Sequence, residues 1–151
     1  AKINDYQLVF VGPFDKRHTP SLIKLIDKLN LRHLCVWKGW IDEDEKLSLL
    51  NECHALIIAS LWEGFGLPAL EAMACGTPVI ASDRGALREV MGNYGYFINP
   101  FNIQSIACAM KAVINDKKCF EKALQEGPSR AESFNWLDTA RTIEKIIQEI
   151  D

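Results

Sequence analysis

Two glutamates, Glu63 and Glu71, stand on either side of a short loop that contains the glycines Gly64 and Gly66. Glycine lets a backbone approach a ligand closely and adopt conformations that are closed to other residues. Pro68 follows the loop and suits the first position of a helix, whose free amides and positive dipole end would favour a phosphate. Each carboxylate can accept hydrogen bonds from two neighbouring hydroxyls. The stretch therefore predicts a site for a ligand that carries both phosphate and sugar hydroxyls.

Each of these features also has a simpler structural explanation. Glu71 alone, early in a helix, is typical of a carboxylate that interacts with the helix dipole on a solvated face. Glu63 alone would be a loop charge, and Gly76 an ordinary helix C-cap. Trp62 and Phe65 would by default be packing residues. Their occurrence together in one strand-loop-helix segment favours a ligand site over these separate explanations.

Short apolar segments alternate with amphipathic segments along the chain, which predicts alternating strands and helices. Strands are expected at residues 7–12, 34–37, 55–59, 78–81 and 96–98. Helices are expected from residue 19, from residue 42, and at 68–74, 86–91, 103–114, 117–125 and 137–150. The alternation requires parallel strands with helical crossovers. We therefore predict an α/β fold, a doubly wound, Rossmann-like parallel sheet of about five strands with helices on both faces and a helical C-terminal tail.

Local signals refine this prediction. The segment 7–12 is continuously apolar, so we expect a strand buried on both faces. Thr19 and Pro20 predict an N-cap and a first helical residue. Asp42 and Glu45 resemble a capping box at the start of the next helix. The helical tail is expected either to pack on the sheet or to reach toward a partner domain.

The loops after the predicted strands are rich in glycine and polar groups. Gly12, Gly39, the loop 60–67 and the segment 82–85 all follow the carboxyl ends of expected strands. Ligands of open parallel sheets bind at these ends. The pattern therefore predicts one ligand crevice at this edge of the sheet.

Composition limits the class of protein. The chain has 151 residues, of which 48% are hydrophobic and 25% charged, as in one globular domain. A net charge of −3 gives no sign of a nucleic-acid or anionic-membrane footprint. No apolar run approaches the ~20 residues of a membrane span. The chain opens at Ala1, without an initiator methionine, so we expect it to be part of something longer.

The five cysteines are irregularly spaced and odd in number. This pattern indicates reduced thiols and a cytoplasmic protein. Cys53 and His54 are the only close pair of potential zinc ligands, and sequence neighbours are poor joint ligands. We therefore expect no metal site.

The segment 63–80 resembles the E-x7-E signature of retaining GT-B glycosyltransferases, specifically the family 4 group. The resemblance extends to residues 39–45, to Ser82 with 85–87 and 89–90, to Gly95, to 99–100 and to 134–136. It covers essentially the whole chain, and it is to the C-terminal, donor-binding domain alone. It implies that residues 1–151 form a single nucleotide-sugar-binding domain that lacks the N-terminal acceptor domain.

The resemblance also implies roles for particular residues. Glu63 would be catalytic, in contact with the transferred sugar near the reaction centre, and Glu71 would hold the ribose diol. The backbone amides of Phe65, Gly66 and Leu67 would bind the donor sugar and the diphosphate. The nucleobase region would be formed by four further residues, Gly12, Pro13, Trp40 and Ile41.

The implied reaction is the transfer of a hexose from a UDP-, GDP- or ADP-hexose, with retention at the anomeric carbon and without a metal or other cofactor. Mannose and glucose are the first expectations, with a saccharide or lipid-linked acceptor, as in polysaccharide biosynthesis. The missing acceptor domain would be the protein partner, and any peripheral association with a membrane would run through it. We expect the isolated domain to bind a nucleoside diphosphate weakly and to be inactive.

Some residues depart from the family's pattern. The strand that ends at Gly12 matches the family's second strand, so the first strand-helix unit and its basic diphosphate-binding residues are expected to be missing. Lys16 and Arg17 follow the wrong strand to replace them. Arg88 stands where the family commonly has proline, and it could be a surface charge or a weak phosphate contact.

Two other classes of function stay open from the sequence. One is a module that binds a nucleotide-sugar without catalysing transfer. The other is an epimerase or a hydrolase on the same GT-B-type scaffold, since paired carboxylates also run glycoside hydrolysis. Dehydrogenase, P-loop and serine-hydrolase functions are not expected, because their glycine and nucleophile motifs are absent.

Overall fold

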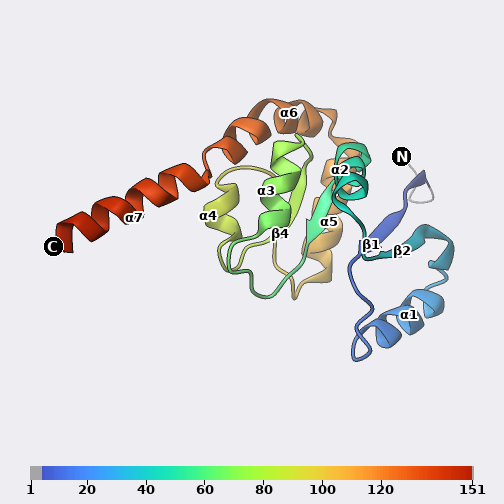
Figure 1. Cartoon of the computed structure of the whole chain (residues 1–151). Helices are drawn as coiled ribbons and strands as arrows, with labels where there is room; N and C mark the ends of the chain where they lie inside the picture. The colour runs from blue at the N-terminus through green and yellow to red at the C-terminus, as the bar shows by residue number, and fades with distance from the viewer. Residues whose placement is uncertain (1–4, 151) are drawn as a thin grey trace. The chain divides into compact units, whose positions relative to one another are not determined.

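The computed structural model describes residues 5–150, and strands and helices alternate through most of them (Figure 1). The strands are β1 (Leu8–Val11), β2 (Cys35–Gly39), β3 (Leu56–Ile58), β4 (Val79–Ser82) and β5 (Tyr96–Ile98). The helices are α1 (Thr19–Lys28), the 3-10 helix η2 (Arg32–Leu34), α2 (Glu43–Glu52), α3 (Leu67–Ala74), α4 (Leu87–Met91), α5 (Ile103–Asn115), α6 (Lys117–Glu132) and α7 (Trp136–Ile150). All strand pairs are parallel, so the predicted α/β fold is confirmed.

The chain divides after Ser48 into two compact units. In the first unit, β1 pairs with β2. In the second, the strand order is β3-β4-β5, with β4 in the centre. The five predicted strands are therefore all present, as a two-stranded and a three-stranded parallel sheet.

The prediction that residues 7–12 are buried on both faces is wrong. Leu8, Val9 and Val11 of β1 are exposed. Phe10 stacks on Trp37 of β2, with ring centroids 4.3 Å apart. Burial on both faces requires helices over both faces of a sheet, and α1 is the only complete α-helix among the described residues of this unit.

The start of α1 also differs from the prediction. The N-cap is His18, which makes no side-chain cap bond, and Thr19 is already helical. The Thr19 hydroxyl instead accepts a hydrogen bond from the backbone N–H of Asp15 at 3.1 Å. Pro20 is consequently the second helical residue, a shift of one position that is common at helix ends.

The predicted cap of α2 is confirmed on one side. Asp42 Oδ1 accepts a hydrogen bond from the backbone N–H of Glu45 at 2.8 Å. The Glu45 carboxylate does not return to the cap but forms an ion pair with Lys38 Nζ at 2.7 Å. This pair joins β2 to the first turn of α2 and spans the loop that carries Trp40 and Ile41.

The second unit contains a core on each face of its sheet, as a doubly wound fold requires. On one face Val79 and Ala81 of β4 pack in a cluster with buried residues of other elements, namely Ala69, Ala72 and Met73 of α3, Leu87, Val90 and Met91 of α4, and Ala123 of α6. On the other face Ile80 packs with Ile98 of β5 and with Ala109 and Val113 of α5. Truncating Met73 to alanine in this core is expected to cost about 2–5 kcal/mol.

Helix α6 runs past Gly127 and Pro128, where the sequence predicted an end near residue 125. Tertiary packing explains the difference, because a Cβ at Gly127 would lie 2.5 Å from the Met73 carbonyl oxygen and 2.9 Å from the Tyr94 hydroxyl. The close contact between α6 and α3 therefore requires glycine and outweighs its low helix propensity.

Helix α7 has no buried residue. Its apolar side chains are exposed, namely Trp136, Leu137, Ile143, Ile146, Ile147 and Ile150. Of the helical tail expected after residue 102, α5 packs on the sheet through Ala109 and Val113, whereas α7 buries no residue. No helix within residues 5–150 combines the length and the hydropathy that crossing a membrane requires.

Candidate functional site

The loop between β3 and α3 follows the carboxyl end of β3, where the crevice was predicted (Figure 1). Gly66 caps α3 with a φ of 96°. A Cβ at this position would lie 2.7 Å from Leu87 Cδ2, so both the backbone angle and the available space favour glycine. Helix α3 begins at Leu67, which makes Pro68 the second helical residue and not the first.

The amides of residues 61–67 have no partner within the described chain, and the last three of them lead directly into α3. The N–H groups of Phe65, Gly66 and Leu67 donate to no acceptor there. The N–H groups of Ala69 and Leu70 are already used, because both donate to the Gly66 carbonyl, at 2.9 and 3.3 Å. The sequence predicted free amides from residue 65 to residue 69. Of these, only the amides of residues 65 to 67 are free in the described chain. Unpaired amides at a helix N-terminus can bind an anion.

Glu63 is half-buried and held at both its side chain and its backbone. Its carboxylate accepts a hydrogen bond from the Ser60 hydroxyl at 2.6 Å. Its carbonyl accepts one from the backbone N–H of Ala86 at 3.1 Å. A Cβ on Gly85 would lie 2.6 Å from the same carbonyl oxygen, so the loop after β4 can approach Glu63 because residue 85 is glycine.

Glu71 is half-buried in the second turn of α3. It lies in a groove of about 330 Å³ between α3 and α6, lined also by Leu70, Ala74, Pro128, Ala131 and Glu132. The groove is open and mainly apolar apart from its two carboxylates. A carboxylate beside an apolar wall can accept hydrogen bonds from a hydroxyl-bearing ring that rests on the wall.

The predicted nucleobase residues lie in the first unit, where the structure brings them to one end of a sheet. The backbone N–H of Gly12 donates to the Gly39 carbonyl at 2.8 Å, so the carboxyl ends of β1 and β2 are adjacent. Pro13 and Trp40 follow directly, and Trp40 is 83% exposed. Ile41 is half-buried. The other predicted site residues, from Glu63 to Glu71, belong to the second unit.

Arg17 is engaged within its own loop. Its guanidinium pairs with Asp15 at 3.2 Å, and the His18 ring lies 2.9 Å from the same carboxylate. Hydrogen bonds from His18 and then from Arg17 lower the pKa of Asp15 to about 2. The Arg17 charge is therefore already balanced by a carboxylate in its own loop.

Two arginines follow β4 at the same end of the sheet as Glu63. Arg84 lies over the Phe101 ring at 5.0 Å, and Arg88 over the Phe97 ring at 4.5 Å. Both guanidinium groups thus make cation–π contacts. The alternatives for Arg88, surface charge or phosphate contact, stay open.

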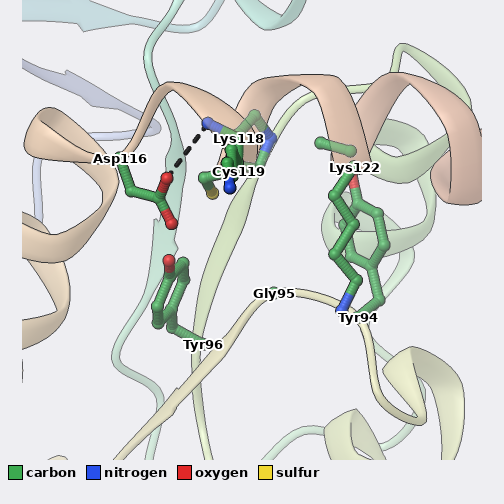
Figure 2. Close-up of a pocket in the computed structure, with 9 residues that line it drawn as sticks. Tyr94, Gly95, Tyr96, Asp116, Lys118, Cys119 and Lys122 are labelled. Atoms are coloured by element: carbon green, nitrogen blue, oxygen red, sulfur yellow. Dashed lines mark hydrogen bonds between the residues drawn. The ribbon is translucent and has the colours of Figure 1, made fainter.

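A cavity of about 360 Å³ lies at the other end of the sheet, against Gly95 and the start of β5 (Figure 2). In Figure 2 the Tyr96 hydroxyl points toward the start of α6, where Asp116 accepts a hydrogen bond from the Lys118 backbone N–H at 3.0 Å. Burial, aided by a hydrogen bond with Cys119, raises the pKa of Tyr96 to about 12. The cavity lies at the amino ends of the strands, away from the end where such folds bind ligands.

The sequence did not predict a role for Ser60, although a hydroxyl three residues before a carboxylate in a loop is a recognisable signal. It also gave no role to Ala86, since only the fold brings its N–H to Glu63. No three potential ligands among His, Cys, Asp and Glu gather into a metal site within residues 5–150.

Comparison with known proteins finds similarity to glycosyltransferases. The chain is 29% identical over 136 residues to the serotype-specific mannosyltransferase WbdA of Escherichia coli, covering 89% of this chain and 17% of WbdA. It is 32% identical to the C-terminal domain of a group 1 glycosyl transferase, LpcC, from Francisella tularensis, with a TM-score of 0.76 and coverage of 87% and 71%. HepE from Anabaena, solved in complex with UDP-glucose, is 23% identical and shares the fold, with a TM-score of 0.83 over 95% of this chain and 41% of HepE.

The chain thus spans a small part of the curated mannosyltransferase and under half of HepE. A family model, that of the glycosyl transferases group 1, matches residues 1–130. This match covers most of the chain, and the parallel α/β units and the relatives agree with it. The chain therefore belongs to the glycosyl transferases group 1 family.

Proposed function

We propose that this chain is the donor-binding half of a retaining, metal-independent GT-B glycosyltransferase of family 4. It binds a nucleoside diphosphate hexose, which the complete enzyme transfers to a saccharide or lipid-linked acceptor. The observation that carries the proposal is that the unpaired amides of Phe65, Gly66 and Leu67, which lead into α3, lie two to four residues after Glu63, whose carboxylate is held by Ser60.

The chemistry follows from these groups. The unpaired amides and the positive end of α3 bind the diphosphate and stabilise the negative charge that it gains as the leaving group. The Glu63 carboxylate, fixed by its hydrogen bond from Ser60, faces the transferred hexose and accepts hydrogen bonds from its hydroxyls. Hydrogen bonds that are set before the reaction need little reorganisation in the transition state.

Glu71 binds the ribose diol, for which its place on the wall of the α3–α6 groove is suited. Gly12, Pro13, Trp40 and Ile41 form the nucleobase region of the first unit. Support for the sugar comes from relatives: WbdA is named a mannosyltransferase, and HepE is solved with UDP-glucose. We therefore propose mannose or glucose as the hexose.

We further propose that an N-terminal acceptor domain, together with a first strand-helix unit that bears basic diphosphate-binding residues, completes the enzyme. The short span of WbdA that the chain covers supports this. So does α7, whose residues Trp136, Ala140, Ile143, Ile147 and Ile150 are spaced as in the seam of a coiled coil. The exposed seam of α7 packs on the rest of the enzyme, which is cytoplasmic and reaches a membrane only through its acceptor domain.

The test is a calorimetric titration of the full-length protein with UDP, GDP and ADP and with their mannose and glucose conjugates. We expect one nucleotide series to bind, and its hexose to be transferred with the anomeric configuration kept. Binding without turnover on any acceptor would favour a non-catalytic module. Release of free hexose, or of an epimer, would favour a hydrolase or an epimerase. Absence of binding to all three series would overturn the proposal.

A further inference from the structure

Arg130, in the last turn of α6, binds the end of a different helix. Its Nε donates to the Val90 carbonyl at 2.9 Å, and its Nη2 donates to the Glu89 carbonyl at 2.5 Å. Both carbonyls lie in the last turn of α4, where a helix leaves its carbonyls unpaired and favours a cation. The half-buried guanidinium of Arg130 thus caps α4 from outside.

The same guanidinium also reaches an aromatic pair. It lies 4.9 Å from the centroid of the Phe134 ring. Phe134 in turn meets Phe65 edge to face, with ring centroids 5.7 Å apart and an interplanar angle of 87°. Contacts of both kinds are favourable, and more so when they are partly removed from water. Phe65 lies in the glycine loop, between Gly64 and Gly66.

The other end of α4 contacts the glycine loop directly. The Ala86 N–H donates to the Glu63 carbonyl at 3.1 Å. The buried Leu87 side chain fills the space where Gly66 would otherwise carry a Cβ. These contacts form a closed circuit. The glycine loop contacts the start of α4, and the end of α4 binds Arg130. Arg130 contacts Phe134, which contacts Phe65 of the glycine loop.

The backbone that bears the unpaired amides is part of this circuit of contacts. A loop with glycines at residues 64 and 66 loses much conformational freedom when it is ordered. Contacts that order the loop before the ligand arrives remove that cost from binding. Arg130 contacts both the end of α4 and the Phe134 ring.

We propose that Arg130 and Phe134 are positioning residues for the donor diphosphate. This inference rests on the proposed function. Arg130 and Phe134 hold residues 63–67 so that the three amides converge on one ligand and the Glu63 carboxylate keeps its direction. They act through Phe65 and α4 and do not touch the donor.

The test compares full-length wild type with Arg130→Met, which keeps the apolar stem and removes the donors and the charge. Wild type is first titrated with UDP, GDP and ADP. The diphosphate that binds and the monophosphate of the same nucleoside are then titrated into each variant. The amides hold the diphosphate, whereas the nucleoside is held elsewhere. We therefore expect Arg130→Met to weaken the diphosphate about 10- to 100-fold and the monophosphate by less than about threefold, and to lower kcat by a comparable factor.

Arg32→Met is the matched control, because Arg32 is exposed and pairs with Asp27 in the first unit. We expect its affinities for both nucleotides to equal those of wild type. Phe134→Leu, which keeps apolar bulk, is expected to lose the diphosphate selectively as well. If Arg130→Met does not fold, Arg130→Lys replaces it, since lysine keeps the charge without the two-pronged, planar contact.

The outcomes separate this inference from the proposed function. If wild type binds none of the three diphosphates, the proposed function fails. If wild type binds but the folded Arg130 and Phe134 variants match it, the positioning role is overturned. Equal weakening of the diphosphate and the monophosphate would also overturn it, because that result indicates a general loss of structure.

Discussion

The Ser60 hydroxyl donates a hydrogen bond to Oε1 of Glu63 at 2.6 Å. A short hydrogen bond to a carboxylate is stronger than one between neutral groups. This bond fixes the direction of the Glu63 carboxylate. The role proposed for Glu63, accepting hydrogen bonds from the reacting sugar, requires such a fixed direction.

Ser60→Ala should therefore lower turnover more than it lowers donor affinity. We expect kcat of the full-length enzyme to fall about 10- to 100-fold, because a misplaced reacting group is costly. The dissociation constant of the nucleoside diphosphate should stay within a factor of about two. Ser60→Thr keeps the hydroxyl and is the control. An unchanged kcat in Ser60→Ala would show that the hydrogen bond has no role in the reaction.

Glu71→Gln should weaken binding of the ribose. Removing a hydrogen bond to a charged group costs about 1.5–3 kcal/mol, which is roughly 10- to 100-fold in the dissociation constant. The loss should be much smaller for the 2′-deoxynucleotide, which lacks one of the two hydroxyls. Glu132→Gln changes the other carboxylate of the same groove and serves as control. If calorimetry finds that Glu71→Gln loses the same affinity for the nucleotide and for its 2′-deoxy analogue, Glu71 does not bind the ribose diol.

Gly66→Ala and Gly64→Ala form a matched pair. At Gly66 the φ is 96° and a Cβ would lie 2.7 Å from Leu87 Cδ2, whereas at Gly64 a Cβ would meet nothing within 4 Å. We expect Gly66→Ala to lower the free energy of unfolding by about 1–3 kcal/mol and Gly64→Ala to be tolerated. Urea denaturation of both variants measures this. Equal stabilities would mean that the loop can relax around a side chain at residue 66.

The exposed seam of α7 should matter only in the longer protein. In this chain, replacing Ile143 and Ile147 with serine should change the free energy of unfolding by less than about 0.5 kcal/mol, because α7 has no buried residue. In the full-length enzyme the same change should lower it by about 2 kcal/mol or more, through lost burial of apolar side chains. Denaturation curves that coincide in the full-length protein would contradict the proposed contact.

The raised pKa of Tyr96, about 12, makes stability depend on alkaline pH. The fold favours the neutral phenol, so this contribution to stability is complete below the ordinary tyrosine pKa of about 10 and is lost as the pH rises toward the folded-state value. Burial raises the pKa of Tyr94 still further, so two phenols should titrate late in phenolate absorbance, and Tyr96→Phe should remove the earlier of the two. If the wild type and Tyr96→Phe titrate identically, the pKa of Tyr96 is not raised by the fold.

Local patterns predicted the second unit well, because its sequence signals and its tertiary packing agree. The bounds of β4, β5 and α3 differ from the predictions by at most one residue at each end. The candidate residues from Glu63 to Glu71 were also accessible to sequence reasoning, since they are neighbours along the chain.

Features that depend on distant contacts were missed. Arg130 bonds to carbonyls about 40 residues earlier, and no periodicity in the sequence reports that contact. Gly127 and Pro128 signal a helix end, yet α6 continues because Gly127 packs closely on Met73. The apolar pattern of β1 predicted burial, but a pattern cannot tell which elements will cover a strand.

The most direct test of the central claim is to follow the backbone amides of this chain by ¹H–¹⁵N NMR during titration with UDP, GDP and ADP. We predict that the amide signals of Phe65, Gly66 and Leu67 shift and saturate with one of these diphosphates, and shift little with the corresponding nucleoside. Unchanged signals of these three amides, with shifts of amides elsewhere, such as those around the cavity of Tyr96 and Cys119, would contradict a diphosphate site in this loop.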